Sequence, residues 1–86
     1  MELNDLWKTA LAEIELNVSR AAFLTWFKNT SVVSIDDNRI FVSVPNGFVK
    51  EWLQNKYNKF VLRAIRNINS QVKEVNYVIG TKESAQ

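Results

Sequence analysis

The sequence contains neither cysteine nor histidine, and it has only two glycines and one proline in 86 residues. Without cysteine the chain can form no disulfide, and without histidine it lacks the commonest metal ligand and general base. The two glycines, Gly47 and Gly80, lie too far apart to build a glycine-rich loop that cradles nucleotide phosphates. We therefore expect no metal, no cofactor, no ATP site and no enzymatic activity.

Long apolar runs are also missing. No stretch approaches the roughly 20 apolar residues of a membrane-spanning helix. The first residues do not show the basic segment, apolar segment and small-residue cleavage site of a secretion signal. We expect a cytoplasmic protein that does not contact a membrane.

The residues that are present have the balance of a globular protein, since 47% are apolar and 23% are charged. A chain of this length fits one small domain, which we place at residues 1–80. Residues 81–86, "TKESAQ", are polar and aperiodic, and we predict that they begin a flexible linker or tail. The net charge of +2 is too small to predict strong nucleic-acid binding, so the distribution of the cations matters more.

Two short helices are predicted at the start of the chain. Asn4 is a candidate N-cap for a helix over residues 5–17, in which apolar side chains recur at helical spacing. Ser19 is a candidate N-cap for a second helix that ends near Asn29.

A hairpin and a long helix follow. Runs of β-branched residues on both sides of "DDNR" predict two strands joined by a turn. Asp36 and Asp37 are therefore interpreted as turn residues rather than as a catalytic pair. Pro45 ends the hairpin, and Asn46 can cap one helix of about six turns over residues 47–68.

The last predicted element is a strand over residues 72–79, with a bulge near residues 73–75 where the alternation slips. The predicted order is helix, helix, strand, strand, helix, strand. A three-stranded sheet needs a cover on one face, and the long helix has the apolar side to provide it. We predict an α+β domain of two layers, with a three-stranded sheet covered by helices.

The predicted long helix has an apolar face and a basic flank. At about 100° per residue its core face comprises Val49, Leu53, Tyr57, Phe60, Val61, Ala64, Ile65 and Ile68. A neighbouring sector about 80° wide carries what we name the basic stripe, Lys56, Lys59, Arg63 and Arg66. A solvated helix face is the simplest interpretation of this stripe.

Phe48 projects toward the basic sector, and Trp52 lies at the border between the two sectors. Phe48 is therefore predicted to lie outside the core. An aromatic side chain flanked by cations is typical of a partner-binding surface. The alternative is that Phe48 packs on the hairpin or on the second helix.

Trp7 also has two interpretations. It either belongs to the core or anchors a contact between two copies of the chain. The neighbours that share its helix face include Leu3, Leu6 and Ala10. Trp26, which stands between Phe23 and Phe27 on a short helix, is assigned to the core.

Taken together, these features resemble the N-terminal domain (domain I) of the bacterial chromosomal replication initiator DnaA. The resemblance is carried by "LW" at Leu6, by "F-x-x-W" at Phe23, by "VPNGFVKEWLQNKY" from Val44 and by the element order. It covers almost the whole chain, and it is specific in combination rather than in any one motif.

The resemblance implies a K-homology-like α+β fold, self-association through the first helix, and recruitment of the replicative helicase and of regulators of initiation. Self-association is expected around Trp7 with Leu3, Leu6 and Ala10, and the partner contact around Phe48, Trp52 and Asn46. Weak binding of single-stranded DNA is also implied, for which the basic stripe is the candidate. ATP binding and recognition of the origin sequence belong to other domains of such initiators.

One position departs from the family pattern, because some members place an acidic residue before the phenylalanine of the second helix and this chain has Ala22. The nearby Arg20 would reverse the charge of that surface. Two alternatives stay open. The chain could be a K-homology-like single-strand binder, although it lacks the G-X-X-G loop of that class, or it could be a freestanding paralogue of an initiator domain.

Overall fold

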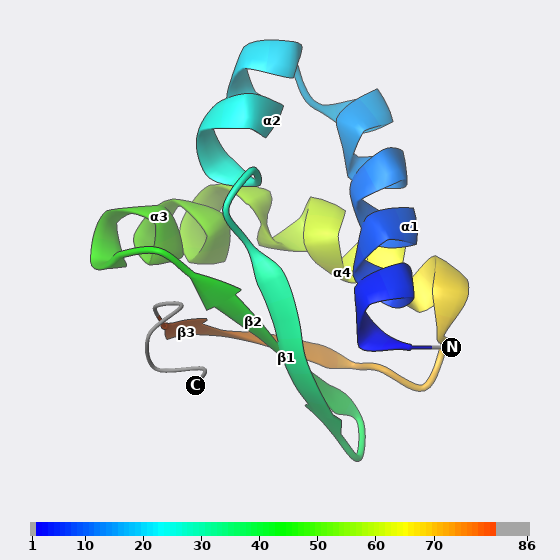
Figure 1. The fold of residues 1–86 in the computed structure, drawn as a ribbon. Helices are drawn as coiled ribbons and strands as arrows, with labels where there is room; N and C mark the ends of the chain where they lie inside the picture. The colour runs from blue at the N-terminus through cyan, green and yellow to red at the C-terminus, as the bar shows by residue number, and fades with distance from the viewer. Residues whose placement is uncertain (1, 81–86) are drawn as a thin grey trace.

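The computed structural model describes residues 2–80, so the predicted tail at residues 81–86 lies outside the described part. Helices and strands follow the predicted order along the chain (Figure 1). The elements are α1 (Leu3–Asn17), α2 (Arg20–Trp26), β1 (Ser31–Asp36), β2 (Arg39–Val44), α3 (Gly47–Trp52), the π-helical turn η1 (Leu53–Tyr57), α4 (Asn58–Ile68) and β3 (Glu74–Ile79). None of the helices in this part of the chain is long and apolar enough to cross a membrane.

The sheet is mixed, and β2 lies at its centre. β1 and β2 form the predicted antiparallel hairpin, while β3 pairs in parallel with β2, which requires the crossover that α3, η1 and α4 provide. The helices lie on one face of the sheet, and α1 packs against α4 (Figure 1). The predicted two-layer α+β fold is confirmed.

The core lies between the helices and the sheet because alternate side chains of each strand point to one face. Ile40, Val42 and Val44 of β2 are fully buried beneath the helices. The predicted core face of the long helix is confirmed. Its fully or nearly fully buried members are Val49, Leu53, Tyr57, Val61, Ala64 and Ile65, and Phe60 and Ile68 pack partly buried against them.

The predicted bulge in the third strand is wrong. β3 pairs with β2 without a break in register, and the irregularity of the sheet lies in β1, between Val32 and Ser34. The break in the alternation of apolar and polar residues near residues 73–75 instead marks the start of β3 at Glu74. Val72 is buried ahead of the strand, and the backbone N–H groups of Lys73 and Glu74 both donate to the carbonyl of Asn38.

Two of the three predicted N-caps are confirmed. The N–H of Ala22 donates to Ser19 Oγ at 3.1 Å, and the N–H of Val49 donates to Asn46 Oδ1 at 2.9 Å. The prediction for Asn4 is wrong, because α1 already begins at Leu3 and its cap position makes no side-chain bond. The second helix also ends earlier than predicted, at Trp26.

The predicted long helix is not a single α-helix, because η1 interrupts it. The buried residues Val49, Leu53, Tyr57, Val61 and Ile65 recur at a strict spacing of four. In a regular α-helix each such step rotates by about 40°, so four steps would turn the buried face by about 160°. The wider turn of η1 absorbs part of this rotation and keeps the two halves of the helix facing one core.

Candidate functional site

Three aromatic side chains from two helices meet at the surface, and we name them the aromatic patch: Trp26, Phe48 and Trp52. Trp26 stacks on Trp52 with ring centroids 4.8 Å apart and an angle of 20° between planes. Phe48 lies against both tryptophans, 5.4 Å from Trp26 and 6.4 Å from Trp52. Phe48 is 63% exposed, whereas the two tryptophans are half-buried.

The patch is held from below and from the side. Tyr57, which is buried, lies 6.4 Å from Trp26 and makes an edge-on contact with Phe27 at 5.7 Å. The Asn46 cap fixes the first turn of α3, from which Phe48 projects. The rings are thus set in position before any partner arrives, which lowers the entropy lost on binding.

One cation borders the patch. Lys56 Nζ lies 5.2 Å from the ring centroid of Trp52, within the range of a cation–π contact. Beside it is a shallow depression of about 250 Å³ lined by Glu51, Trp52, Asn55 and Lys56. Exposed aromatic rings with a basic edge suit a protein partner that supplies apolar side chains and some negative charge.

The structure brings together the three residues predicted as a partner contact, Asn46, Phe48 and Trp52. Phe48 lies outside the core, as predicted. Trp26, predicted as a core residue, packs against the core only partly buried. Phe27 takes the fully buried position at the end of α2, and the Trp26 ring turns toward α3 instead. Ala22, where some family members carry an acid, is half-buried on α2.

Trp7 is a core residue of the single chain, with 4% of its surface exposed. Its Nε1 donates to Thr30 Oγ1 at 3.1 Å, and that hydroxyl donates to the carbonyl of Phe27 at 2.7 Å. Leu6 and Ala10 are buried as well, and Leu3 is half-buried. The core interpretation of Trp7 is therefore confirmed, while self-association through this helix stays a prediction.

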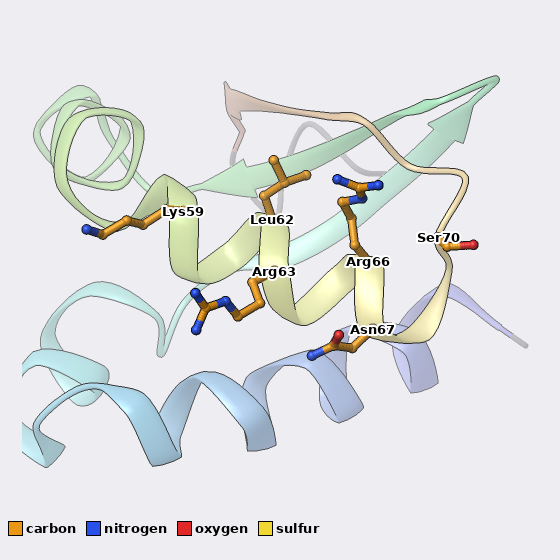
Figure 2. A pocket seen from close by; sticks show the side chains of 6 residues that line it. All are labelled: Lys59, Leu62, Arg63, Arg66, Asn67 and Ser70. Atoms are coloured by element: carbon orange, nitrogen blue, oxygen red, sulfur yellow. The ribbon is translucent and has the colours of Figure 1, made fainter.

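The four residues of the basic stripe are all exposed, but they do not form one surface. Lys56 lies in η1 beside the aromatic patch. The other three line an open groove of about 470 Å³ along α4, which we name the basic groove. Its lining is Lys59, Leu62, Arg63, Arg66, Asn67 and Ser70 (Figure 2).

The acidic pair of the hairpin shapes the turn, as predicted. Asp37 adopts a positive φ of 60°, and Asp36 pairs with Arg39 at 3.6 Å. In residues 2–80 no group of three or more acidic side chains is arranged to hold a metal ion.

The model of one protein family, described as the DnaA N-terminal domain, matches residues 4–67. The match covers about three quarters of the chain and contains both the aromatic patch and most of the basic groove. The chain belongs to the DnaA N-terminal domain family. Membership identifies it as the N-terminal domain of a DNA replication initiator. β3 follows the matched residues, so the sheet described above includes a strand beyond the match.

Proposed function

We propose that the aromatic patch is the surface through which this DnaA N-terminal domain binds its protein partners, namely the replicative helicase and regulators of initiation. The observation that carries the proposal is the position of Phe48. This large apolar side chain is 63% exposed, although the Asn46 cap and the stacked tryptophans hold it in place. A fixed, exposed aromatic ring gains most when a partner covers it.

The energetics of such a patch fit weak and reversible binding. Aromatic side chains at the centre of an interface often contribute at least about 2 kcal/mol each, but a surface this small carries few of them. Affinity in the micromolar range is expected, as suits a domain that exchanges a helicase and regulators during initiation.

The test is Phe48→Ala, with binding of the replicative helicase measured by titration calorimetry. We expect affinity to fall by about thirtyfold, the equivalent of about 2 kcal/mol. The melting temperature should hardly change, because most of the ring is already in water. Leu16→Ala is the matched control, since Leu16 is 85% exposed on α1 outside the patch. Unchanged helicase binding by the Phe48 variant would end the proposal.

Self-association of the domain is a separate part of the proposed function. Because Trp7 is buried and bonded to Thr30, we assign it a supporting role, in which it fixes α1 against the chain that follows α2. Sedimentation equilibrium over a concentration series, with thermal unfolding alongside, tests this role. We expect Trp7→Ala to melt much earlier than the parent chain. A variant that melts normally but no longer self-associates would make Trp7 a direct contact instead.

A further inference from the structure

Three cations of α4, Lys59, Arg63 and Arg66, line the basic groove and form no ion pair with the described acidic residues. Lys59, Arg63 and Arg66 are spaced by four and three residues, so they lie along the solvent-exposed face of α4 that forms the basic groove. Like charges at this spacing destabilise a helix rather than support it. Among residues 2–80, no carboxylate lies within ion-pair distance of these three side chains.

The other two arginines of the chain behave differently. Arg20 pairs with Glu15 at 3.5 Å, and Arg39 pairs with Asp36 at 3.6 Å. Arg63 and Arg66, which both line the groove, thus form no ion pair with the described acidic residues. An unpaired guanidinium offers its full fork of donors to a carboxylate from outside, often through two parallel bonds.

An aliphatic side chain lies among these cations. Leu62 is half-buried and lines the groove between Lys59 and Arg66. Figure 2 shows Leu62 and Arg66 on one side of α4 and Arg63 and Asn67 on the other, with Lys59 and Ser70 toward the ends. Asn67 is already engaged, since its Nδ2 donates to Glu13 Oε2 at 2.6 Å. The hydrogen-bond donors that remain free in the groove therefore belong mainly to the three cations, which lie around the apolar side chain of Leu62.

We infer that the basic groove binds an acidic peptide segment of a protein partner. Carboxylates of the peptide pair with Arg63 and Arg66, Lys59 adds a third charge, and an aliphatic side chain of the peptide packs on Leu62. The distance from Lys59 to Arg66 along the helix is about 10 Å, the reach of a short acidic motif. This binding uses a different surface from the aromatic patch and does not depend on the proposed function of that patch.

The lining favours a peptide over a nucleic-acid strand. Proteins that bind single strands stack bases on exposed aromatic side chains. The lining of this groove includes no aromatic ring, and the adjoining Phe60 is half-buried, with its ring centroid 5.7 Å from Lys59 Nζ. The aromatic rings of the patch lie on the other side of η1, with Lys56 rather than with the groove. Neither glycine of the chain lines the groove, so it has no glycine loop to clamp a phosphate backbone.

The test is a fluorescence anisotropy titration of the whole chain with a labelled peptide of repeated Glu-Glu-Leu. The double variant Arg63→Gln, Arg66→Gln should bind it about tenfold more weakly, as expected for the loss of two partly exposed charge-assisted contacts. The control Lys8→Gln, Lys28→Gln removes the same charge from exposed positions outside the groove and should change affinity by less than about twofold. Thermal unfolding of both variants confirms that they fold.

Two further probes separate the alternatives. A peptide in which Gly replaces Leu should bind several-fold more weakly, because it loses the contact with Leu62 without any change in the protein. A labelled oligothymidine of similar length should bind more weakly than the acidic peptide. The inference is overturned if the acidic peptide does not bind, if both double variants lose affinity equally, or if the oligothymidine binds more tightly and depends on Arg63 and Arg66.

Discussion

The aromatic patch takes Phe48 and Trp52 from the α3 half of the interrupted helix and Trp26 from α2, whereas the basic groove lies along the α4 half. The two surfaces differ in almost every physical property. The patch consists of rings fixed by stacking, with a single cation at its edge. The groove consists of cations around one leucine, and it is open to solvent. The α3 and α4 halves pack against the same core, and η1 lies between them, so their exposed surfaces remain separate. The comparison teaches that one helix can present two surfaces, one that relies on buried apolar area and one that relies on charge.

The two halves of the helix are also held in different ways. The α3 half depends on the Asn46 cap and on the rings beneath the patch. The α4 half buries Val61, Ala64 and Ile65 in the core. It also makes polar contacts, in which Tyr77 Oη donates to Asn58 Oδ1 at 3.0 Å and Asn67 Nδ2 donates to Glu13 Oε2. Substitutions can therefore disturb the support of one surface while leaving the other intact.

The largest effect is expected for Phe27→Ala, which removes the fully buried ring under the patch. Phenylalanine to alanine in a packed core costs about 3–5 kcal/mol, and urea unfolding measures it. Phe48→Ala, at the surface of the same cluster, should cost less than about 1 kcal/mol. If both variants lost the same free energy of unfolding, Phe48 would belong to the core. Phe27 could then not be distinguished as the supporting residue and Phe48 as the partner contact.

Alkaline pH should weaken the support of the α4 half. Burial raises the pKa of Tyr77 well above its ordinary value of 10.0, so the folded chain keeps a proton that the unfolded chain releases. Above about pH 10 the free energy of unfolding should therefore fall, with Tyr77 contributing up to about 1.4 kcal/mol per pH unit. Urea unfolding at successive pH values measures the slope. Tyr77→Phe should lose stability less steeply over the same range, and an identical slope would contradict the assignment.

The α3 half should respond to its cap. Asn46→Ala leaves the N–H of Val49 without its partner and should lower the free energy of unfolding by about 1 kcal/mol. Partner binding at Phe48 should weaken too, because the first turn of α3 frays. Asn46→Asp keeps an acceptor at the cap and should retain both properties. If Asn46→Ala lowers affinity with no change in stability, Asn46 touches the partner directly.

How much of this could be predicted from the sequence depends on whether a feature is local. The hairpin, the caps at Ser19 and Asn46, and the exposed position of Phe48 follow from patterns within a few residues of each other. The pairing of Trp26 with Trp52 joins segments far apart in the chain, and the periodicity of either helix alone carries no sign of it. The same limit left the two interpretations of Trp7 open, since its partner Thr30 lies beyond the second helix.

The π-helical turn is an intermediate case. Its signal was present in the strict spacing of four from Val49 to Ile65, which a regular helix cannot keep on one face. A projection at 100° per residue spreads these residues over a broad sector and hides the irregularity. The same projection joined Lys56 to the rest of the basic stripe, whereas the structure assigns it to the edge of the aromatic patch.

The smallest predicted effect is the most direct test of the contrast between the two surfaces. Raising NaCl from about 50 mM to about 200 mM shortens the distance over which exposed charges attract each other. Binding of the Glu-Glu-Leu peptide to the groove should therefore weaken by about threefold. Helicase binding at the patch should change by less than about twofold, because covering the rings is insensitive to screening. If both fall equally, Lys56 rather than the rings carries the patch contact, and Lys56→Gln should then remove the salt dependence of helicase binding.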